Sequence, residues 1–232
     1  MSMSLLAAII LISLILCAIA IPFFIRSFLW QSILKKIYKG QYEEAIQQMN
    51  SPLYTLLFTS YEKNYNILRT YMSKQDAHEI TKQVEFMLSQ NLNNSQAYQV
   101  ASMTYFYFLD DQNVELSKKL LDIIERKGNE DEVAYDRMLY RILIEKKSED
   151  ISFVNELLSK NSDDQQQGIL QYLLGLQYQY LSDVKQANYY FNKAKLLFCK
   201  WVVIVRLFTV FRAHCISISH FFWRQNCHFN KF

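Results

Sequence analysis

The sequence predicts an all-α fold, and three observations support this prediction. The 232-residue chain contains only 4 Gly and 2 Pro, too few for the many tight turns of a β-sandwich or barrel. Apolar residues recur at helical spacing over segments of about 10 to 17 residues. Short polar breaks separate these segments, as at Lys39-Gly40 and Ser182-Asp183. The scarcity of Gly also excludes the glycine-rich loops that bind nucleotide phosphates.

Charge and cysteine divide the chain into three segments. Residues 1–39 carry four basic side chains and no acidic one, residues 40–198 carry 16 basic and all 22 acidic side chains, and residues 199–232 carry five basic side chains and no acidic one. Cysteine occurs only in the first and last segments, so packing rather than disulfide bonds must stabilise the central body. We expect domains at 1–25, 26–198 and 199–232.

Residues 5–25, LLAAIILISLILCAIAIPFFI, form an uncharged apolar run. As a helix this run measures about 32 Å, close to the hydrocarbon thickness of a bilayer. We therefore expect a single-pass transmembrane anchor. Four aromatic residues would then lie at headgroup level: Phe23, Phe24, Phe28 and Trp30. A cleaved signal peptide is the alternative, because Ala18-Ile19-Ala20 has the A-x-A form, but no basic residue precedes the run.

Basic residues follow the apolar run directly, at Arg26, Lys35, Lys36 and Lys39. The positive-inside rule places such residues in the cytoplasm. We therefore expect a cell-membrane protein whose main domain is cytoplasmic. The alternative is that these residues only solvate the first helix after the membrane.

Asn, Asp or Ser stands directly before several of the predicted helices, as N-cap residues do. The predicted caps are Asn113, Asp150 and either Ser182 or Asp183. Together with the polar breaks, they predict pairs of helices arranged as α-hairpins.

The last predicted hairpin has the sequence LQYLLGLQYQYLSDVKQANYYFNKAKLL. Six of its residues have the order L-G-x-x-Y followed by A-x-x-x-F-x-x-A: Leu174, Gly175, Tyr178, Ala187, Phe191 and Ala194. This order resembles the tetratricopeptide repeat. The resemblance implies that the small residues let the two helices approach and that the aromatic residues fill the gap between them. Gln171 and Cys199 occupy the usual tryptophan and proline positions, so the match is incomplete at both ends.

Weaker matches extend the repeat pattern toward the N-terminus. The segment IYKGQYEEAIQQM resembles the second half of a repeat, and repeat starts at Arg26, Ala97 and Gly168 are 71 residues apart. That spacing equals two repeats of about 34 to 36 residues. The resemblance implies a right-handed superhelix over residues 26–198, similar to bacterial membrane-anchored repeat proteins. A generic helical bundle is the alternative.

The first helices of such repeats line a concave surface that binds protein or peptide partners. The resemblance places nine residues on that surface: Tyr98, Ser102, Tyr105, Asp136, Arg137, Tyr140, Tyr172, Gln179 and Tyr180. Tyrosine suits recognition because it offers a large contact area with a polar tip. The alternative is that these tyrosines only pack between helices.

Little in the sequence indicates catalysis, a cofactor or a metal site. His78, the one histidine of the central body, has Asp76 and Glu79 close by, but these neighbours point to different sides of a helix. The acidic balance of residues 40–198 would repel nucleic acid. We therefore expect a non-enzymatic, membrane-anchored adaptor for a protein partner. The alternatives are a structural subunit of a membrane complex, an extracytoplasmic chaperone if the topology is reversed, and a hydrolase with a hidden site.

The last segment, residues 199–232, combines three cysteines and three histidines with many aromatic residues and no acid. We favour frameshifted or read-through sequence after Phe198, because the composition changes abruptly there. A membrane-surface segment is the second interpretation. A metal site is the third, although no C-x-x-C or H-x-x-x-H pair occurs. Its candidate ligands are Cys199, His214, Cys215, His220, Cys227 and His228.

Overall fold

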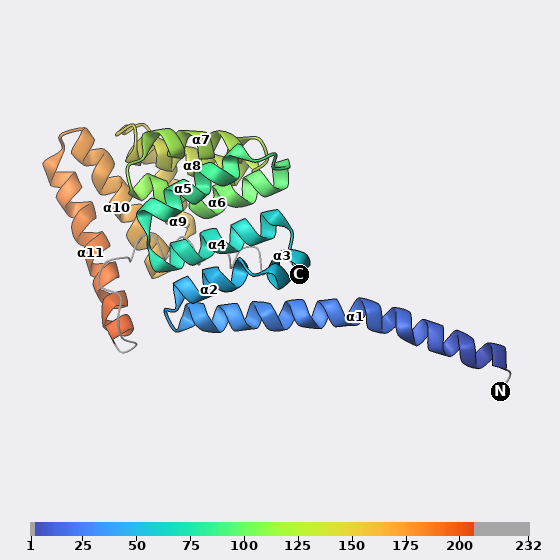
Figure 1. The fold of residues 1–232 in the computed structure, drawn as a ribbon. Helices are drawn as coiled ribbons and strands as arrows, with labels where there is room; N and C mark the ends of the chain where they lie inside the picture. Colours follow the sequence, from blue (N-terminus) through green and yellow to red (C-terminus); the bar gives the residue numbers. More distant parts are fainter. Residues whose placement is uncertain (1–2, 207–232) are drawn as a thin grey trace. The chain divides into compact units, whose positions relative to one another are not determined.

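The computed structural model describes residues 3–206 and describes side chains at 11–12 and 20–197. Every regular element in this part is a helix, so the all-α prediction is confirmed. Figure 1 shows the helices. They are α1 (Met3–Tyr38), α2 (Tyr42–Met49), α3 (Pro52–Leu57), α4 (Ser60–Lys74), α5 (Ala77–Ser89), α6 (Asn94–Asp110), α7 (Val114–Glu125), α8 (Glu130–Leu143), α9 (Ile151–Lys160), α10 (Asp164–Tyr180) and α11 (Val184–Arg206).

The turns between paired helices share one backbone feature, a residue in the left-handed conformation. These residues are Gly40, Gln75, Gln112, Lys146 and Ser182, and neighbours in this series are 34 to 37 residues apart. In four of the turns, all except the one at Lys146, the left-handed residue donates its N–H to a carbonyl three residues back. The next residue donates to a carbonyl five residues back. This is the Schellman pattern, which satisfies carbonyls at a helix end. A left-handed turn residue therefore recurs about every 35 residues, and four of these five turns have the same Schellman pattern.

Side-chain caps begin several helices, and two of the predicted caps are confirmed. The Oδ1 atom of Asn113 accepts the Leu116 N–H at 3.0 Å, and that of Asp183 accepts the Gln186 N–H at 3.0 Å. Asp150 occupies the predicted N-cap position of α9, but its side chain accepts no cap hydrogen bond. Its carboxylate binds Arg141 instead.

The described chain divides into two compact units between Gln96 and Ala97. In the first unit, the second half of α1 packs against α2, α3 and α4. The core of this packing consists of Ile33, Ala45, Met49, Tyr54, Phe58 and Ile67. Trp30 packs against this core, and the guanidinium of Arg69 lies 5.8 Å from the centroid of its ring. The short helix α3 was not predicted.

The second unit has its own core, built from the inner faces of α6 to α10. Its largest fully buried side chains come from α6 and α7 and are Tyr105, Phe108, Leu109, Leu120, Leu121 and Ile124. The inner face of α10 adds Leu173 and Leu174. Burial of these apolar faces, at roughly 25 cal/mol per Å², is the main force that holds the hairpins together.

Among the residues whose side chains are described, no helix is both long and apolar enough to cross a membrane. Most of the predicted anchor, positions 5–10 and 13–19, lies outside the residues with described side chains, while its backbone belongs to α1. The predictions for residues 207–232, including five of the six candidate metal ligands, also lie outside the described residues, and the side chain of the sixth, Cys199, is not described. The backbone of residues 199–206 belongs to α11.

Candidate partner-binding surface

The six residues that resemble the repeat pattern lie on α10 and α11, which pack closely against each other. Leu174, Gly175, Ala187 and Ala194 are buried there. A Cβ atom added at Gly175 would lie only 2.5 Å from the ring of Phe191, so no larger residue fits without movement. The ring of Tyr178 stacks on Tyr190 with centroids 5.3 Å apart. The contact between α10 and α11 is thus formed by small residues and aromatic rings.

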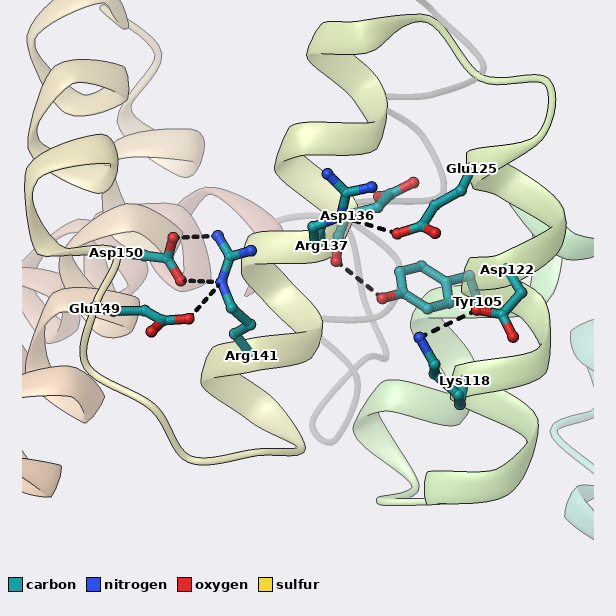
Figure 2. Close-up of polar contacts among 9 residues, drawn as sticks. All are labelled: Tyr105, Lys118, Asp122, Glu125, Asp136, Arg137, Arg141, Glu149 and Asp150. Carbon is teal, nitrogen blue, oxygen red and sulfur yellow. Dashed lines mark hydrogen bonds and ion pairs between the residues drawn. The ribbon is translucent and has the colours of Figure 1, made fainter.

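Three of the nine predicted partner-binding residues lie in the interior. Tyr105 is fully buried, Asp136 is 1% exposed and Tyr140 is 7% exposed. The hydroxyl of Tyr105 donates to the backbone carbonyl of Asp136 at 2.9 Å, which joins α6 to α8 (Figure 2). These side chains hold neighbouring helices together, and a direct contact with a partner is not available to Tyr105.

Two further tyrosines make the same kind of connection with half-buried side chains. The hydroxyl of Tyr98 on α6 donates to Glu132 Oε2 on α8 at 3.0 Å. The hydroxyl of Tyr180 on α10 donates to the carbonyl of Ile142 on α8 at 3.1 Å, and burial raises the pKa of Tyr180. The first helices of three consecutive hairpins, α6, α8 and α10, are therefore linked in order by tyrosine hydroxyls.

The remaining predicted residues reach the surface to different degrees. Arg137 and Gln179 are exposed, and Ser102 and Tyr172 are half-buried. Arg137 Nε donates to Glu125 Oε1 at 2.9 Å, across from α8 to α7 (Figure 2). The ring of Tyr172 lies 5.7 Å from that of Phe191. Of the nine residues, Arg137 and Gln179 are the exposed ones.

Sequence reasoning missed the main polar cluster of the second unit, which is centred on Arg141. Its guanidinium binds both carboxylate oxygens of Asp150, with Nε at 2.8 Å from Oδ2, and Nε lies 3.2 Å from Glu149 Oε1 (Figure 2). The hydrogen bond to Asp150 raises the pKa of Arg141. The backbone N–H of Asp150 donates to Gln177 Oε1 at 2.9 Å, so the cluster ties the α8–α9 loop to α10.

No periodic signal pointed to this cluster, because its members belong to a helix end, a loop and a distant helix. A second ion pair nearby, Lys118 with Asp122 at 3.1 Å, follows the i,i+4 spacing of a helix surface, and that hydrogen bond raises the pKa of Lys118 (Figure 2). The Arg141–Asp150 ion pair becomes visible only in the structure. The Lys118–Asp122 ion pair could have been predicted from the sequence spacing alone.

Comparison of the chain with family models, curated proteins and solved structures returned no match.

The polar groups of the described residues are arranged for packing and surface contact. His78 has a side chain that is 84% exposed, with Nε2 at 3.9 Å from Glu79 Oε1. Within residues that the structure describes, no three His, Cys, Asp or Glu side chains are grouped so that they could hold a metal ion. The α6–α8–α10 series instead presents half-buried tyrosines beside exposed polar residues, a combination that suits noncovalent recognition.

Proposed function

We propose that this protein is a membrane-anchored, non-enzymatic adaptor that binds a protein or peptide partner through its array of helical hairpins. In this proposal residues 5–25 form a single transmembrane anchor and the hairpins form a tetratricopeptide-like repeat array. The hairpins face the cytoplasm.

The continuity of α1 carries the proposal. This helix runs without interruption from Met3 to Tyr38, so one element contains both the uncharged run and the residues of α1 that pack in the core of the first unit. Ile33, two turns past the end of the run, is fully buried in the core of the first unit. A helix that is fixed in a core at one end and apolar at the other couples the body mechanically to whatever holds its apolar end. A bilayer accommodates an uncharged helix of this length.

The recurring turn supports the repeat array. Left-handed turn residues recur about every 35 residues, four of them in Schellman turns, and this spacing equals the length of a tetratricopeptide unit. The tyrosine links from α6 to α8 and from α10 to α8 place the first helices of successive hairpins next to each other. Repeat arrays that bind partners use this arrangement of first helices.

The charge around the end of the uncharged run supports the topology. Arg26, Lys35, Lys36 and Lys39 all follow the run, and no basic side chain precedes it. A reporter fused after residue 198 tests this: a fluorescent protein that matures in the cytoplasm gives signal, and alkaline phosphatase at the same site gives none. The opposite pair of results would make the chaperone alternative the better one.

The partner surface that we propose is smaller than the one inferred from the sequence. Arg137 and Gln179 contact the partner, aided by the half-buried rings of Tyr98, Tyr172 and Tyr180. The buried side chains of Tyr105, Asp136 and Tyr140 position the helices from within. An aromatic surface with exposed polar groups at its edge is typical of peptide-recognition sites.

In-cell cross-linking followed by mass spectrometry tests the adaptor function. The full chain is compared with Arg137→Ala/Gln179→Ala and with a control, Lys195→Ala/Asn188→Ala, which removes the same kinds of side chain from exposed positions of α11. We expect the first variant to lose the partners that the wild type and the control retain. Equal recovery from all three proteins would move the contact elsewhere and favour a permanently packed structural subunit.

A further inference from the structure

The short helix α3 departs from the hairpin pattern and carries an exposed apolar face. It lies between α2 and α4, and the chain from Ser51 to Tyr61 contains no charged residue. Leu56 is 81% exposed and Leu53 is 47% exposed, three positions apart and hence on one side of the helix. The opposite side is fixed in the core, where Tyr54 is buried and its ring stacks on Phe58 at 3.9 Å.

Arg26 ties this helix to a defined level of α1. Its Nη1 donates to the carbonyl of Leu57 at 3.3 Å, and its guanidinium lies 4.5 Å from the centre of the Phe58 ring. Its Nη2 donates to Glu62 at the start of α4. Arg26 is the first charged residue after the uncharged run, so these contacts hold α3 at the level where the run ends. The ion pair with Glu62 also offsets the charge of Arg26 at this level.

The part of α1 next to this level is apolar and exposed on several sides. Its exposed residues are Ile21, Phe23, Phe24 and Phe28. In Figure 1, α3 lies at the side of the first unit from which the N-terminal half of α1 extends. The headgroup layer on one side of a bilayer is roughly 5 to 8 Å thick, and a helix with its side chains is about 10 Å across. A helix held level with the last residues of a span therefore reaches this layer.

We infer that α3 is a second membrane contact, in which Leu53 and Leu56 enter the boundary between lipid headgroups and acyl chains beside α1. This inference rests on the proposed anchor. The contact would fix the tilt of the first unit relative to the bilayer, because two points of attachment resist rotation that one helix allows. Short apolar segments without charge bind at this boundary by burying leucine side chains.

The apolar face has a lipid rather than a protein occupant because Arg26 holds α3 beside the end of the uncharged run, which the proposed anchor places in the bilayer. A second copy of the chain would have to reach Leu53 and Leu56 beside the end of the span, where the proposed anchor places lipid. The absence of charge from Ser51 to Tyr61 fits a lipid boundary, whereas the rims of protein interfaces are polar.

Photo-cross-linking of the full chain in vesicles of phosphatidylcholine and phosphatidylglycerol tests the inference. Benzoylphenylalanine replaces Leu56 in one protein, Phe24 in a second as a reporter of the anchor, and Tyr38 in a third as a control. Tyr38 is 88% exposed on the same helix but lies about 18 Å beyond Arg26 along the axis. Intact-mass spectrometry after irradiation counts lipid adducts and cross-linked dimers, and circular dichroism verifies that helicity is kept.

We expect lipid adducts at positions 24 and 56, each severalfold above the level at position 38. Adducts at position 24 with only the control level at position 56 would overturn the inference and leave the anchor in place. A dimer as the main product at position 56 would overturn it in favour of a second copy. Absence of lipid adducts at both positions 24 and 56 would overturn the anchor and the inference together.

Discussion

Gly175 shows how a single hydrogen atom in place of a side chain sets the distance between two helices. An added Cβ would lie 2.5 Å from the Phe191 ring, while alanine in a helix is favoured over glycine by about 1 kcal/mol. Overpacking typically costs about 1 to 3 kcal/mol. We therefore expect Gly175→Ala to destabilise the protein by about 1 kcal/mol. In a Phe191→Ala background the same substitution should stabilise by about 1 kcal/mol, because the clash is gone.

Unfolding of the detergent-solubilised full chain, followed by circular dichroism, measures both effects. The coupling between the two positions is the decisive quantity. Equal effects of Gly175→Ala in both backgrounds would show that Phe191 does not limit the approach of α10 and α11.

Arg141 and Arg137 lie one turn apart on α8 but in different surroundings. The Asp150 side chain that binds Arg141 is 7% exposed, whereas the side chains of Arg137 and Glu125 are 49% and 28% exposed. Removing one partner of a buried pair leaves a buried charge without compensation. We expect Arg141→Ala to destabilise by about 2 to 3 kcal/mol and Arg137→Ala by less than about 1 kcal/mol. Thermal unfolding of the two variants side by side checks this, and equal losses would contradict it.

At the scale of the element, the capping box at the start of α4 makes stability depend on pH. Partial burial acts to raise the pKa of Glu62, but hydrogen bonds from Thr59 and Arg26 outweigh it and hold the pKa below its ordinary value of 4.5. A carboxyl whose pKa is lowered on folding contributes stability above its unfolded pKa. That contribution is lost as the pH falls below about 4.5.

Glu62→Gln should therefore lower the melting temperature at pH 7, and the difference from wild type should shrink as the pH falls below about 4.5. Thermal unfolding at a series of pH values measures this. Glu44→Gln is the control, because this exposed residue of α2 has a hydrogen bond only to the nearby Gln41. A difference between wild type and Glu62→Gln that stays constant with pH would contradict the prediction.

The elements that could be predicted from sequence are those with a local signal. Gly40 and Ser182, predicted as polar breaks, are left-handed turn residues in the structure, and Asn113 and Asp183 cap helices as predicted. These predictions succeed because turns and caps depend on a few neighbouring residues. Asp150 has the same local sequence signal as a cap. The Asp150 carboxylate instead binds Arg141, which lies nine residues earlier on α8, and no local sequence pattern predicts that contact.

The candidate surface was less predictable than the helices for the same reason. A repeat pattern places Tyr98, Tyr105 and Tyr180 on first helices, but it does not say whether a tyrosine points to solvent or to the next helix. That choice depends on where a carbonyl or carboxylate of the neighbouring hairpin lies, such as the Asp136 carbonyl that receives the Tyr105 hydroxyl. The helix α3 escaped prediction because six residues are too few to show a period.

At the scale of the whole molecule, α1 contains both the uncharged run and residues that pack in the core of the first unit, and this makes the proposed anchoring testable without truncation. Leu14→Arg/Ala18→Arg places two charges near the middle of the run. Each arginine at the centre of a span costs about 2.5 to 3.5 kcal/mol for insertion. We expect the wild type to resist extraction of cell membranes by alkaline carbonate and the variant to be released in large part.

The control Glu44→Arg/Gln47→Arg adds the same residues to exposed positions of α2, and it should stay with the membrane like the wild type. Release of the wild type by carbonate would show that α1 does not span, and the adaptor would then need another means of attachment.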